Sequence, residues 1–131
     1  MATTRLAIKN ATEDNFRKME DCLWKMEDAI KNNDIVLHGQ YDYQFHLEIC
    51  RATKNDIFVM AYKVIGNTLM QHTTKLNEAF FEKALKQKLG DDVHWKLYRA
   101  IKAGDIDACR KLYAEMFSVY EIIPSDVIEG C

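Results

Sequence analysis

An aspartate and a histidine four residues apart, Asp42 and His46, are the residues whose types and spacing could carry chemistry in this sequence. Residues at i and i+4 share one face of a helix, so the carboxylate and the imidazole would point the same way. Phe45 and Ile49 place the pair beside an apolar stripe, and a buried carboxylate needs a partner because burying an unpaired charge is costly. That partner could be a metal ion. On spacing alone, a plain Asp–His hydrogen bond is the simpler interpretation.

Two further histidines are predicted to face inward from other helices. His94 shares an apolar helix face with Tyr98, and His72 lies on the apolar stripe of another helix. Singly, each histidine is typical of a protein core. Three histidines and one aspartate directed into one small bundle indicate a metal site, because imidazole and carboxylate suit zinc, nickel, iron or manganese. His38, beside Gly39, is expected to lie outside this group at an exposed helix start.

The composition excludes several classes of protein. Hydrophobic residues make up 48% of the sequence, charged residues 29%, and the net charge is -2. This is a soluble globular mixture without the basic stripe of a nucleic-acid surface. No apolar run has the roughly 20 residues of a membrane span, and the polar N-terminus is not a secretory signal. We expect a cytoplasmic protein with reduced thiols, because no Cys-x-x-Cys spacing occurs among Cys22, Cys50, Cys109 and Cys131.

The elements that must position these residues are helices. One proline and five glycines in 131 residues favour long helices over a turn-rich β fold. Capping residues and apolar periodicity predict helices over about 13–31, 35–53, 56–76, 80–89, 93–103 and 106–120. The inward stripe of the third helix is predicted to consist of Phe58, Ala61, Ile65, Leu69, His72 and Leu76. The sequence therefore predicts an all-α antiparallel bundle of about six helices.

Two blocks of the sequence resemble a family signature. The first is Tyr41–Ile49, with the pattern Asp-x-x-Phe-His, followed by Ala52–Asn55. The second is His94–Asp105, which ends in Ala-Gly-Asp. Together, and in this order, they resemble the FadR C-terminal domain, the effector-binding half of many GntR-type bacterial transcription regulators. The resemblance covers the chain from about Thr4 to Tyr120.

The resemblance implies a helical bundle with a central ligand cavity and a bound small carboxylate effector. Many members hold a divalent metal (zinc, nickel or manganese) through one aspartate and three histidines; others bind the effector without a metal. Carried over, Asp42, His46 and His94 match three of these ligands. The fourth falls on Met116, whose thioether is a poor ligand for a hard ion, although an open metal site needs only three protein ligands. The candidates for effector-lining residues are Leu69, His72, Tyr98 and Met116.

The same resemblance implies how the chain is organised. Residues 1–131 are expected to be one effector-binding domain with a truncated first helix, and DNA is reached only through an N-terminal winged helix absent from this sequence. We predict a ligand sensor that is not an enzyme and that forms a homodimer, because paired DNA half-sites mirror a protein two-fold. Exposed parts of the helix over residues 13–31 are a candidate dimer surface. The alternatives are a metal-free structural dimerisation module and a small metal-dependent hydrolase.

Overall fold

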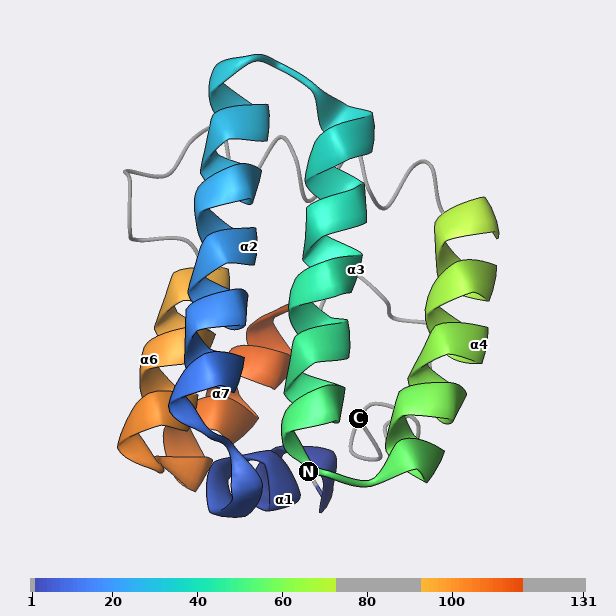
Figure 1. Cartoon of the computed structure of the whole chain (residues 1–131). Coiled ribbons are helices and arrows are strands. Elements are labelled where there is room, and N and C mark those ends of the chain that lie inside the picture. The colour runs from blue at the N-terminus through green and yellow to red at the C-terminus, as the bar shows by residue number, and fades with distance from the viewer. Residues whose placement is uncertain (1, 73–92, 117–131) are drawn as a thin grey trace.

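The structure, a computed structural model, describes the backbone of residues 2–72 and 93–116 and the side chains of residues 2–66 and 93–115. The described parts contain six helices and no strand (Figure 1). These are α1 (Ala2–Asn10), α2 (Glu13–Lys31), α3 (Ile35–Ala52), α4 (Asp56–His72), α6 (Val93–Ala103) and α7 (Ile106–Met116). The predicted all-α class is confirmed. The helix predicted over residues 80–89 lies outside the described residues.

Local capping explains where α2 and α3 begin. Thr12 and Asn15 form a reciprocal capping box, in which Thr12 Oγ1 accepts from the Asn15 backbone N–H at 3.3 Å and Asn15 Oδ1 accepts from the Thr12 N–H at 3.0 Å. At the start of α3, Asp34 Oδ1 accepts from the Leu37 N–H at 3.0 Å and caps the helix through this single bond. Such caps satisfy backbone donors that have no partner within the helix. Both predicted helix starts are therefore confirmed.

The helices form a bundle around one apolar core. α2 packs along α3, α4 packs on another side of α3, α1 crosses beneath them, and α6 and α7 form a pair behind α2 (Figure 1). The turn between α6 and α7 uses Gly104 at a φ of 73° and Asp105, whose side chain caps α7. A left-handed φ favours glycine, as the sequence predicted. The fully buried core side chains include Met19, Leu23, Phe45, Ile49, Leu97, Ile101 and Cys109.

The sequence did not predict helix α1. Its buried residues include two threonines, Thr3 and Thr4, so it lacks the apolar stripe of an amphipathic helix. Tertiary contacts hold it in place instead. Thr4 Oγ1 donates a hydrogen bond to the hydroxyl of Tyr113 at 3.2 Å, and the Asn10 side chain donates to the carbonyl of Thr53 at 2.8 Å. α1 therefore contacts α7 and the C-terminal end of α3 at the base of the bundle.

The inward face of α4 differs from the predicted one. Ala61 and Ile65 were expected in the core, but both are exposed, Ile65 by 38%. Gly66 faces α3 instead, and a Cβ atom added to it would lie only 2.4 Å from Cε2 of Tyr43. The ring of Tyr43 stacks on that of Tyr62 at 5.4 Å between centroids. The close approach at the glycine and the stacked rings set the rotation of α4, and that rotation turns Ala61 outward.

The described part of the chain contains neither a disulfide nor a helix suited to span a membrane. Cys22, Cys50 and Cys109 form no disulfide there. None of the described helices combines the length and the apolar character that crossing a bilayer requires.

Candidate functional site

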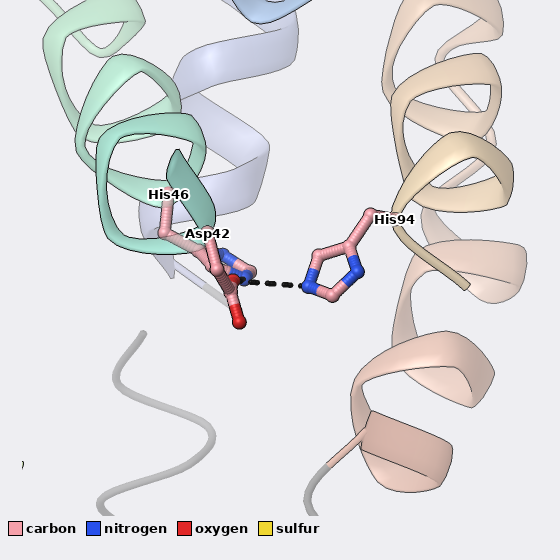
Figure 2. A group of neighbouring side chains, drawn as sticks. All are labelled: Asp42, His46 and His94. Carbon is pink, nitrogen blue, oxygen red and sulfur yellow. Dashed lines mark hydrogen bonds and ion pairs between the residues drawn. The ribbon is translucent and has the colours of Figure 1, made fainter. Parts of the chain in front are cut away.

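Three of the side chains singled out in the sequence meet between α3 and α6. Oδ1 of Asp42 lies 3.2 Å from Nε2 of His46, one turn further along α3, and 3.0 Å from Nε2 of His94 on α6. Figure 2 shows the His94 ring extending from α6 towards the two α3 side chains. One potential ligand atom from each residue lies within 4.8 Å of the other two. Side chains from positions 52 residues apart, Asp42 and His94, thus converge on one point.

The helices position these groups through apolar and polar contacts behind them. Phe45 is fully buried and meets the rings of His46 and His94 edge-on, at centroid distances of 5.3 Å and 5.8 Å. It therefore limits the rotation of both imidazoles. The first turn of α6 is held by Trp95, whose indole N–H donates to the buried carboxylate of Glu27 on α2 at 3.1 Å. That contact places His94 opposite α3.

The electrostatics keep the central carboxylate ionised. The side chains are 22% exposed for Asp42, 15% for His46 and 6% for His94, so the cluster is largely shielded from water. Burial by itself raises the pKa of Asp42, but the positive charge of His94 and the hydrogen bonds from both imidazoles outweigh it and hold that pKa well below its usual value of 3.8. A carboxylate only accepts hydrogen bonds, so each Nε2 carries a hydrogen in this arrangement.

The donor set fits a divalent cation. Ligand atoms around a tetrahedral ion with bonds of about 2.0–2.1 Å lie roughly 3.4 Å apart. The distances from the Asp42 oxygen to the two nitrogens, 3.0 Å and 3.2 Å, are close to that spacing. Two imidazoles and one carboxylate suit zinc, nickel or manganese, and three protein ligands leave a coordination position open. Each nitrogen would first give up the hydrogen that it now shares with Asp42.

Comparison with known proteins decides the family. Residues 1–118 match the model of the FCD domain family. The chain belongs to that family. The resemblance inferred from the two sequence blocks is thereby confirmed, because the FCD domain is the C-terminal domain of FadR-type regulators.

Two curated relatives are similar to part of this FCD domain. Both are the Glc operon transcriptional activator, from two Escherichia coli strains, and each is 26% identical over 102 residues. The match covers 76% of this chain but only 40% of each relative. The chain thus spans less than half the length of the curated relatives that it matches.

Of the other predicted site residues of the FCD domain, Tyr98 has a described side chain, and it is not part of the three-residue cluster. Tyr98 lies one turn after His94, and its hydroxyl donates to Glu20 on α2 at 3.1 Å. Burial and this carboxylate raise the pKa of Tyr98 to about 12. The effector-lining role of Tyr98 stays a prediction. The same holds for three residues whose side chains lie outside the described part of the chain, Leu69, His72 and Met116.

The prediction for His38 was wrong. It was expected at an exposed helix start, but it is only 2% exposed. The signal was present in the spacing, because His38 precedes Asp42 by four residues and Phe45 by seven, which puts all three on one helix face. The neighbouring Gly39 was given too much weight. His38 is thus a buried histidine on α3 of the FCD domain, and it lies outside the three-residue cluster.

Proposed function

We propose that this FCD domain is the effector-sensing part of a transcription regulator, and that it holds a divalent metal through Asp42, His46 and His94. The observation that carries the proposal is the convergence of these three donors from α3 and α6. Membership of the FCD family and the similarity to a transcriptional activator support the regulatory role. The metal would be zinc, nickel or manganese.

The ligand that we propose is a small carboxylate. When bound, the metal would supply a positive centre with an open position, which a carboxylate oxygen can occupy. Asp42 would offset part of the metal charge. Phe45 would keep both imidazole rings in place through its edge contacts, so the ligand atoms stay directed to one point. The two imidazoles and the carboxylate all serve as ligands in this arrangement, so we propose binding of the effector without turnover.

The proposed signal travels through helix packing. An effector seated against ligands from both α3 and α6 favours one arrangement of these helices over another only if it binds the two arrangements with different affinity. In a regulator, such a shift would change the geometry of an attached DNA-binding domain. We propose that DNA is contacted through that further domain, in a cytoplasmic homodimer whose two-fold symmetry matches paired half-sites.

A second candidate is a metal-free domain, either a direct effector binder or a structural dimerisation module. It is favoured by the hydrogen bonds of Asp42 with His46 and His94, at 3.2 Å and 3.0 Å, because these bonds satisfy the buried polar groups without an ion.

Elemental analysis by mass spectrometry tests the metal. The whole chain is purified gently, reloaded separately with zinc, nickel and manganese, and compared with His46→Ala and His94→Ala. Asp28→Ala on α2 is the control, because Asp28 is exposed and remote from the cluster in sequence. We expect about one metal per chain, retained by the control and weakened roughly tenfold or more when a ligand is removed. A thermal-shift screen of small carboxylates then tests the effector.

No bound metal after reloading would contradict the metal site and support the metal-free candidate. In that case a carboxylate that raises the melting temperature would identify a direct effector binder. The lack of any such shift would favour the structural module.

A further inference from the structure

The outer face of α4 carries an apolar stripe. Ile57 is 74% exposed, Met60 67% and Val64 69%. They are spaced by three and four residues, which places them in one row along the helix. α4 lies at the edge of the bundle and packs against α3 (Figure 1). A row of large apolar side chains this exposed is typical of an interaction surface.

The outer face of α2, the dimer surface suggested by the sequence, has the opposite character. Apart from Trp24, which is 48% exposed, the exposed side chains of α2 include charged residues that pair along the helix, as Asp14 Oδ2 with Lys18 Nζ at 3.1 Å and Asp21 Oδ2 with Lys25 Nζ at 3.0 Å. Such pairs are favourable in water and gain little from being covered. The exposed apolar side chains of α4 therefore make its outer face a better candidate for the dimer surface than that of α2.

The charges beside the stripe fit a second copy of the same chain. Asp56 and Lys63 are seven residues apart, two turns, so they lie on the same edge of the stripe. When two α4 helices pack stripe to stripe about a two-fold axis perpendicular to them, the helices run in opposite directions. This edge of one helix then lies beside the same edge of the other. Asp56 of one copy then faces Lys63 of the other, and the contact occurs twice. A parallel pair would instead set this edge against the opposite one, where Ala61 lies.

We propose that the α4 stripe, formed by Ile57, Met60 and Val64, pairs with the same stripe of a second copy in an antiparallel, two-fold arrangement. This inference rests on the homodimer of the proposed function and names its surface. Ile57 of one copy would lie against Val64 of the other, with Met60 near the axis. Three side chains per copy fall short of the roughly 1,000 Å² expected of a stable interface, so the dimer formed by α4 alone is weak and depends on concentration.

Sedimentation velocity of the whole chain over a concentration series tests the surface. We compare Met60→Lys with Val36→Lys, a change at an equally exposed position on α3, since both side chains are 67% exposed. The wild type and Val36→Lys are expected to dimerise with similar affinity. Met60→Lys raises the dissociation constant at least tenfold, because two like charges meet near the axis. Circular dichroism confirms that each variant is folded.

A charge exchange tests the antiparallel orientation. Asp56→Lys weakens the dimer, because the new lysine faces Lys63 of the second copy, and adding Lys63→Asp restores it. A wild type that stays monomeric at every concentration, a dimer unaffected by Met60→Lys, or a double variant that is not restored overturns the proposal. Metal content measured on the same samples separates this result from the sensor function, since no α4 stripe residue belongs to the metal-ligand cluster.

Discussion

The most direct test of the cluster as a physical unit is Asp42→Asn in the presence of a chelator. The substitution keeps the size and shape of the side chain and removes its negative charge. In the folded chain, Oδ1 of Asp42 accepts from His46 at 3.2 Å and from His94 at 3.0 Å, and the three side chains are at most 22% exposed. The variant therefore changes the strength of two shielded hydrogen bonds and little else.

The expected cost follows from these two bonds. A hydrogen bond to a charged group contributes about 1.5–3 kcal/mol and a neutral one about 0.5–1.5 kcal/mol, so losing the charge costs about 1 kcal/mol for each bond. We expect Asp42→Asn to lower the free energy of unfolding by about 2 kcal/mol at pH 7. The pH dependence has a definite sign. Because the folded-state pKa of Asp42 lies below 3.8, its contribution is present above that pH and is lost as the pH falls towards the lowered pKa.

Urea unfolding at a series of pH values measures this difference. Asp21→Asn is the control, because Asp21 also accepts from a cation, Lys25 at 3.0 Å, but is 62% exposed and should contribute only a few tenths of a kcal/mol. Equal stability of Asp42→Asn and the wild type at pH 7 would refute the reasoning. So would a difference that stays undiminished as the pH falls well below 3.8.

Two further predictions concern the elements that support the cluster. Gly66→Ala should destabilise the fold, although alanine favours helices by about 1 kcal/mol, because its Cβ would lie 2.4 Å from the Tyr43 ring. In a Tyr43→Ala background the same change should stabilise the fold. Urea unfolding of the wild type, the two single variants and the double variant measures this difference. Additive changes in the free energy of unfolding would show that the contact is unimportant. Thr12→Ala should cost about 1 kcal/mol by removing one half of the capping box with Asn15. A change in unfolding free energy of only a few tenths would contradict the role of that cap.

The sequence alone determined where most helices begin and end. The starts at Thr12 and Asp34 and the turn at Gly104 depend on groups within a few residues of each other, so local chemistry is enough to predict them. The same holds for Asp42 and His46, because one helical turn separates them. In each case the interacting atoms are neighbours along the chain, and no packing information is needed.

The partner of this pair could not be predicted from spacing. His94 lies 52 residues from Asp42, and the two meet only because α6 packs beside α2, which in turn packs along α3. The sequence connected them through family resemblance and a general expectation that inward histidines converge. The structure added the distances, the edge contacts of Phe45 with both imidazole rings, and the burial of His38 on the same face.

Tertiary structure alone decided the orientation of α4 and the existence of α1. α4 has apolar side chains around much of its circumference, so periodicity did not specify which of them face the core. The contact of Gly66 with Tyr43 resolved this choice, and it left Ile57 and Met60 facing outward. α1 buries threonines rather than an apolar stripe, and its helix is held by partners far along the chain such as Tyr113. Both outcomes depend on contacts between distant residues, which a local pattern does not contain.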